Sequence, residues 1–125
     1  MKITLEQMVN AQEGLQWLST EKRLEAVDKF ALAFLLGRVN EHLQQYDKTR
    51  VETLEKYGEK NGDRYDIPTE NRERFNNELR ALLTTECDVP DTVIPVEPLM
   101  DDLTAARILQ LGWLLEKGPP APQEN

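Results

Sequence analysis

The side chains that most often perform acid–base or nucleophilic chemistry are scarce in this sequence. His42 is the only histidine and Cys87 is the only cysteine. A cysteine nucleophile needs a lowered thiol pKa and a nearby base, usually a histidine. Cys87 instead follows Glu86 and precedes Asp88, whose negative charges disfavour its thiolate. We therefore interpret Cys87 as a structural or spare thiol and His42 as an exposed or helix-packed side chain.

Sequence motifs for metal, phosphate and ester chemistry are also missing. One histidine and one cysteine cannot supply a His-rich or Cys-rich metal site. The sequence has no Gly-rich phosphate loop, no G-x-S-x-G and no C-x-x-C. We expect no enzymatic activity, no catalytic residue, no bound metal and no cofactor.

Acidic side chains are concentrated between residues 86 and 102. This stretch holds six carboxylates and no base, namely Glu86, Asp88, Asp91, Glu97, Asp101 and Asp102. It lacks the glycine that calcium-binding loops use for their sharp turn. The simplest interpretation is a solvated acidic surface, and the main functional alternative is a contact with a basic protein partner.

Two tryptophans, Trp17 and Trp113, lie on separate predicted helices near the two ends of the chain. Tryptophan is a large amphipathic side chain that serves as a core residue or as an anchor at a protein interface. We take Trp113, together with the six acids of residues 86–102, as the candidate partner-binding residues.

The elements that must position these side chains are mostly helices. A Thr-x-x-Gln capping box at Thr4 predicts a first helix over about 5–18. Two good N-cap residues, Ser19 and Thr20, precede a long run without proline, which predicts a second helix over about 20–57. At 1.5 Å per residue this helix is about 55 Å long. No single ordinary neighbour covers that length, so we expect two shorter helices to share it.

Beyond Tyr57 the chain must turn back. Two glycines, an Asn61-Gly62 turn signal and Pro68 end the long helix. Asn61-Gly62 is also a hairpin signal, but few apolar residues flank it, so a short β-hairpin and an irregular loop stay open as alternatives. A third helix is predicted over about 71–85, antiparallel to the second half of the long helix.

The C-terminal third has a different pattern. Prolines at 90, 95 and 98 predict an extended segment over 86–102 rather than a helix. A last helix is predicted over about 104–117, ended by a glycine and two prolines, with a flexible tail over 118–125. We expect a single, mainly α domain over 1–117, in which two or three shorter helices pack on the long one.

The centre of the long helix is unusually apolar. Residues 30–36 read Phe-Ala-Leu-Ala-Phe-Leu-Leu. A helix that is apolar on several faces must be covered on several sides. We expect the other helices of the same chain to provide this cover, and a second copy of the chain is the alternative.

Composition and charge exclude several classes of protein. The 125 residues favour one domain, and 23 acids against 15 bases give a net charge of −8. Such a charge disfavours nucleic acid or an anionic membrane surface as the main partner. Residues 1–85 hold fifteen acids and thirteen bases, so most of the excess lies in the last third. With no apolar run of signal-peptide or membrane-spanning length, we expect an intracellular protein.

The order of elements resembles a family of small tailed-phage (prophage) proteins of unknown function that have a long helical hairpin. The resemblance covers roughly residues 11–99. It begins with a short helix and a long charged helix that ends on Leu54-Glu55-Lys56-Tyr57-Gly58-Glu59-Lys60. A polar loop, the run Phe75-Asn76-Asn77-Glu78-Leu79 and an acidic segment follow. This chain departs from the family in its proline-rich tail and its apolar helix centre. The resemblance implies a virion component or an assembly accessory, in the cytoplasm of the bacterial host or in the virion. It brings no catalytic residues.

Three functional hypotheses follow from the sequence. The first is a non-enzymatic protein–protein interaction module, a virion structural protein or assembly accessory. The second is a phage-encoded inhibitor of a host defence enzyme, whose acids imitate nucleic acid phosphates. The third, a metal-dependent hydrolase using acidic residues, has the least support. We expect a virion protein or a host enzyme as partner, neither nucleic acid nor a membrane, and we leave a homo-oligomer open.

Overall fold

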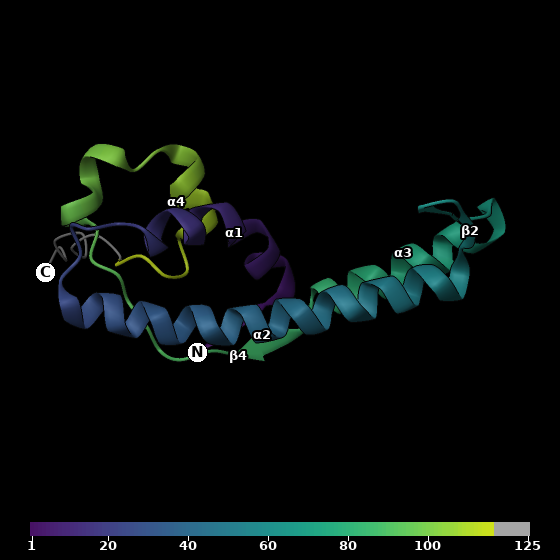
Figure 1. Cartoon of the computed structure of the whole chain (residues 1–125), viewed down its shortest axis with the longest axis horizontal. Coiled ribbons are helices and arrows are strands. Elements are labelled where there is room, and N and C mark those ends of the chain that lie inside the picture. The colour runs from purple at the N-terminus through teal and green to yellow at the C-terminus, as the bar shows by residue number, and fades with distance from the viewer. Residues whose placement is uncertain (117–125) are drawn as a thin grey trace, which may run out of the picture.

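The computed structural model describes residues 1–116, which form an elongated molecule with a thick head and a thin two-helix stalk (Figure 1). We define the stalk as residues 44–83 and the head as residues 1–43 and 84–116. The mainly α architecture with one long helix packed by shorter ones is confirmed.

The long helix α2 (Ala26–Tyr57) has 32 residues and spans about 48 Å. It begins at residue 26, so the predicted start near residue 20 is wrong. Ser19 and Thr20 act at the end of the preceding helix instead of capping α2. The Ser19 hydroxyl donates to the carbonyl of Gln16 at 2.6 Å, and the Thr20 amide donates to that of Trp17 at 3.2 Å. Residues 20–25 form the connection.

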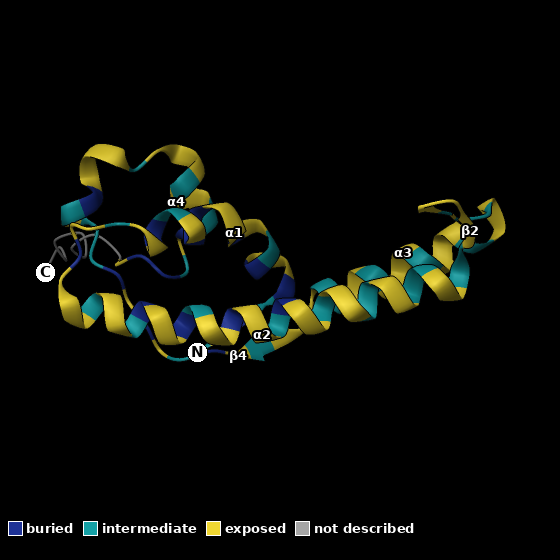
Figure 2. Ribbon diagram, in the orientation of Figure 1, coloured by how far each residue is buried: buried dark blue, intermediate teal, exposed yellow. Residues whose placement is uncertain are grey.

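Helix α1 (Leu5–Ser19) lies along the first half of α2. The predicted capping box is present: the Gln7 amide donates to Thr4 Oγ1 at 3.1 Å, and the Thr4 amide donates to Gln7 Oε1 at 2.8 Å. The core lies in the head, between α1, α2 and the C-terminal segments (Figure 2). Its most deeply buried large side chains are Met8, Leu18, Leu35, Ile94, Leu99, Leu111 and Leu114.

The stalk is made by the second half of α2 and by α3 (Thr69–Leu83), which returns along it. The strands β2 (Glu59–Asn61) and β3 (Arg64–Asp66) form an antiparallel hairpin at its tip, so the hairpin alternative holds. Gly62 makes this turn possible because its φ of 67° is easily reached only without a Cβ. Helix α3 begins and ends two residues earlier than predicted over 71–85. All of its residues keep part of their surface exposed.

A small antiparallel sheet joins the two segments of the chain that make up the head. Strand β1 (Lys2–Thr4) pairs with β4 (Glu86–Asp88), with Ile3 opposite Cys87. This pairing is not visible in the sequence, because each strand has only three residues. The amide of Leu5 also donates to the carbonyl of Thr85 at 3.1 Å, which ties the start of α1 to the end of α3.

The predicted extended segment is extended only in part. Residues 97–102 form a 3₁₀ helix, η1 (Glu97–Asp102), so the expectation that the prolines exclude a helix is wrong here. Pro98 lies in the first turn of η1, where its missing amide hydrogen costs no helical hydrogen bond.

The last helix is also shorter than expected. Helix α4 (Ala105–Leu111) does not reach residue 117, because the backbone beyond it pairs with Ile94. Ile94 donates its amide to the carbonyl of Leu114 at 2.9 Å and accepts the amide of Glu116 at 2.8 Å. Residue 117 and the tail predicted over 118–125 lie outside the described residues.

Helix α1 approaches α4 closely at Gly14. A Cβ at this position would stand 2.9 Å from both Gln110 Oε1 and Leu111 Cγ. We expect Gly14→Ala to lower the free energy of unfolding by about 1 kcal/mol, because overpacking outweighs the gain in helix propensity. Urea unfolding followed by circular dichroism measures this change.

Gly37, in the middle of α2, is the matched control, because nothing beyond the adjoining residues of its own helix lies within 4 Å of its Cβ position. Gly37→Ala should raise the free energy of unfolding by about 0.5–1 kcal/mol. Equal effects of the two substitutions would contradict the close packing of α1 on α4.

Candidate interaction surfaces

The six acids predicted as a partner-binding set do not form one patch. Glu86 and Asp88 lie on β4, beside the middle of α2 (Figure 1), whereas Glu97, Asp101 and Asp102 lie on η1, elsewhere in the head. A single basic surface that met residues 86–102 would therefore have to reach around the head.

Two of these acids are paired with cations of the same chain. Asp91 binds the amino group of Met1, and this hydrogen bond lowers the pKa of the Asp91 carboxyl. Asp102 binds the guanidinium of Arg23. Pairing reduces the negative potential that these two carboxylates offer to a partner. The acidic character of residues 86–102 is thus weaker in the fold than in the sequence.

Arg23 joins two segments of the head through its two carboxylate partners. It donates to Glu21 from Nε at 2.8 Å and from a terminal nitrogen at 2.9 Å, and also to Asp102 at the end of η1. The hydrogen bonds from Arg23 lower the pKa of Glu21 to about 2. This cluster connects the turn between α1 and α2 to η1.

A second group of carboxylates meets in a hollow that the sequence does not reveal. The hollow has a volume of about 420 Å³. Its lining contains four acids, Glu25, Asp28, Glu97 and Glu116, together with Val93, Pro95 and Pro98. The acids come from the start of α2, from η1 and from the strand-like end of the described chain. Only Glu97 belongs to the predicted set, because no local pattern connects residues that far apart.

An apolar groove lies next to this hollow. The groove has a volume of about 450 Å³ and is lined by Val96, Met100, Leu103, Ile108, Gly112, Leu115 and Glu116. Met100 is 64% exposed and Ile108 is 49% exposed. Leu109, the next residue of α4, is 85% exposed.

The tryptophans are held within the molecule. Trp113 is half-buried against the core and donates its Nε1 hydrogen to the carbonyl of Gln110 at 3.0 Å. The ring of Trp17 faces the guanidinium of Arg107 at 4.1 Å from the ring centroid. Both rings thus make contacts within their own chain, while part of each remains exposed.

The apolar centre of α2 is only partly covered by its own chain. Leu32 and Leu35 are buried in the core, as expected. Val27, Phe30 and Phe34 point away from it and are 69%, 68% and 60% exposed. The expectation of complete internal cover is therefore wrong, because α1 and the C-terminal segments reach only one side of this helix.

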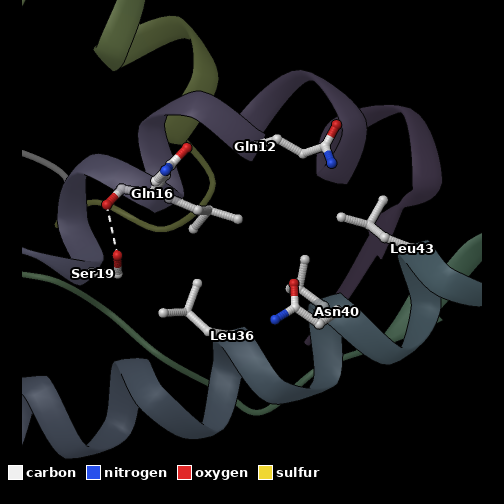
Figure 3. A pocket seen from close by; sticks show the side chains of 8 residues that line it. Gln12, Gln16, Ser19, Leu36, Asn40 and Leu43 are labelled. Atoms are coloured by element: carbon white, nitrogen blue, oxygen red, sulfur yellow. Dashed lines mark hydrogen bonds between the residues drawn. The ribbon is translucent and has the colours of Figure 1, made fainter.

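A polar cleft opens between α1 and α2 (Figure 3). Gln12, Gln16 and Ser19 border it from α1, and Leu36, Asn40 and Leu43 from α2, around a volume of about 360 Å³. Its described lining consists of amides, one hydroxyl and aliphatic side chains. Such a lining offers hydrogen bonds but no group that titrates near neutral pH.

The histidine and the cysteine lie near each other in the fold but do not form a nucleophilic pair. His42 Nε2 lies 2.9 Å from the carbonyl oxygen of Asp88. Burial, and secondarily the charge of Asp88, raises the pKa of the half-buried Cys87 thiol. Within residues 1–116 we find no cluster of three or more His, Cys, Asp or Glu side chains arranged to hold a metal ion. The helices of this part of the chain include none that is long and apolar enough to cross a membrane.

The Arg23 cluster should make stability depend on acidity. The pKa of Glu21 is depressed from an ordinary value of 4.5, so the carboxylate stabilises the fold above that pH. This stabilisation is lost progressively as the pH falls from about 4.5 toward 2. We expect Arg23→Gln to lower the urea midpoint at neutral pH. The difference in midpoint between this variant and wild type should shrink as the pH falls from about 4.5 toward 2.

The control is Arg50→Gln, because the nearest carboxylate of Asp47 lies 3.9 Å from Arg50. Its urea midpoint should stay close to that of wild type throughout the titration. A gap between wild type and Arg23→Gln that stayed constant with pH would contradict the assignment.

Comparison with protein families, with curated proteins and with solved structures found no match to this chain.

Proposed function

We propose that this protein acts by binding another protein, as a phage-type virion component or assembly accessory, and not by catalysis. The observation that carries the proposal is the apolar groove between η1 and α4, because exposed apolar surface next to charged residues is typical of protein interfaces. The resemblance to small tailed-phage proteins motivates the assembly role.

The groove favours a partner segment of defined chemistry. Met100 and Ile108 are exposed residues of its lining and offer apolar contacts. The acids Glu97, Asp101 and Glu116 lie on or beside the segments that line it, and all three are exposed. A helix or loop with one or two apolar anchors flanked by lysine or arginine complements this arrangement.

The elongated shape supports an accessory role. The groove lies in the head, whereas the charged β2–β3 hairpin lies at the far tip of the stalk (Figure 1). One molecule thus offers two separated ends to different neighbours. A spacer of this kind suits a protein that positions components of a larger assembly.

The second hypothesis, inhibition of a host defence enzyme through an acidic surface, keeps one supporting observation. Four carboxylates line the hollow formed by Glu25, Asp28, Glu97 and Glu116. A basic enzyme surface would bind there mainly by charge, and such binding weakens steeply as salt is raised.

Both hypotheses, the assembly accessory and the enzyme inhibitor, are tested by capturing partner proteins on the tagged chain from phage-infected or lysogenic cells. The tagged wild-type chain is compared with Met100→Glu/Ile108→Glu, and the bound virion protein is identified and its affinity measured. We expect the double substitution to weaken binding by at least about tenfold, because it places charges in the apolar groove. Binding by groove contacts should persist in about 0.5 M salt.

Leu109→Glu is the matched control, because Leu109 is an exposed apolar residue of α4 that does not line the groove. It should leave binding unchanged. The inhibitor hypothesis would be favoured if binding were lost in about 0.5 M salt and in the fourfold variant Glu25→Gln/Asp28→Asn/Glu97→Gln/Glu116→Gln, while the groove variant still bound. Equal loss with Leu109→Glu would refute the groove.

A further inference from the structure

The outer face of α2 is an apolar surface that the groove and the acidic hollow do not use. Val27, Phe30 and Phe34 recur at the three- and four-residue spacing that places side chains on one helical face. All three are mostly exposed, and this face is opposite the buried Leu32, Leu35 and Val39. Phe30 and Phe34 pack edge to face, with ring centroids 5.0 Å apart, and form one projecting aromatic pair.

The surroundings of this pair are small and uncharged. The same face carries Ala26, Ala33 and Gly37, and nothing beyond the adjoining residues of α2 lies within 4 Å of the Cβ position of Gly37. At the end of the face, Arg38 and Glu41 neutralise each other in an ion pair of 2.9 Å. A partner recognised by charge would find little to bind on this face, although the chain as a whole has a net charge of −8.

The pattern of large and small residues matches itself when two helices run antiparallel. If Phe30 of one copy lies opposite Phe34 of another, the same register places Val27 opposite Gly37. The exposed valine then meets the position that has open space, and the contact repeats on the other side of a two-fold axis. Antiparallel helices also bring the opposite ends of their dipoles together.

The exposed apolar side chains of this face supply part of the area that a stable dimer needs. At their observed exposure, the two phenylalanines and the valine offer about 350 Å² per copy, or about 700 Å² for a pair. The neighbouring alanines, Gly37 and the stems of flanking side chains add to this area. Specific interfaces bury at least about 1,200 Å², so these neighbouring groups must supply the remaining area.

From these observations we propose that two copies of this chain associate through the outer faces of their α2 helices, antiparallel, around a two-fold axis between Phe30 and Phe34. The surface is separate from the groove proposed to bind a virion protein, so either can be absent without the other. The dimer would place the two grooves and the two stalk tips in a symmetric arrangement.

Sedimentation equilibrium of the full chain tests the association. We expect a dimer at about 100 μM, and a monomer for Phe30→Glu/Phe34→Glu, since two charges per copy would then be buried in the interface. Circular dichroism checks that this variant keeps its helices, which it should, because both side chains are exposed in the single chain. Leu109→Glu is the control for a general loss of apolar surface, and it should remain dimeric.

Cysteine cross-linking tests the orientation of the two helices, in a Cys87→Ser background. A mixture of Val27→Cys and Gly37→Cys chains should form a disulfide-linked dimer under mild oxidation, whereas neither chain should do so alone. In the antiparallel register the two copies of residue 27 lie about 15 Å apart along the helix, beyond the reach of a disulfide.

Three results would overturn the proposal. The first is a wild-type chain that sediments as a monomer at about 100 μM. The second is a dimer that survives Phe30→Glu/Phe34→Glu or is lost in Leu109→Glu, because the contact would then lie elsewhere. The third is efficient cross-linking of Val27→Cys alone, which would indicate parallel helices. None of these results depends on whether the groove binds a virion protein.

Discussion

The length of α2 is the constraint on which the rest of the structure depends. A helix of 32 residues is about 48 Å long, whereas α1 and α3 have 15 residues each and reach about 22 Å. The two short helices therefore cover different halves of α2, one in the head and one in the stalk. The β1–β4 sheet and the hydrogen bond from Leu5 to Thr85 close the junction between these halves.

This division makes the two halves of the molecule unequal. The fully buried side chains belong to the head, whereas every residue of α3 remains partly exposed (Figure 2). The two helices of the stalk meet through half-buried aliphatic and aromatic side chains. They are also linked by an ion pair of 2.9 Å between Lys56 and Glu78, whose side chains are both exposed. Exposed ion pairs contribute little to stability, so the stalk depends on its apolar seam and on its covalent continuity with the head.

The surfaces available for binding follow from the same geometry. The C-terminal segments fill one side of the head, so α2 is left bare on its outer face and α4 ends where Ile94 captures the backbone of residues 114–116. Ile108 and Leu109 of α4 stay exposed, and Ile108 lines the groove beside η1. The surfaces that remain free for contacts with other proteins are therefore those that the fold leaves uncovered.

Local sequence patterns determined most of the helices, the capping box at Thr4 and the hairpin at Asn61-Gly62, because these features depend on residues three or four positions apart. They also indicated the scarcity of catalytic side chains. Only the tertiary structure decided the pairing of β1 with β4, the capture of residues 114–116 by Ile94 and the meeting of Glu25 and Asp28 with Glu97 and Glu116. It also decided that Phe30 and Phe34 face solvent. The physical reason is that these outcomes join segments far apart in the chain, and hydrophobic periodicity shows that a face must be buried without showing what covers it.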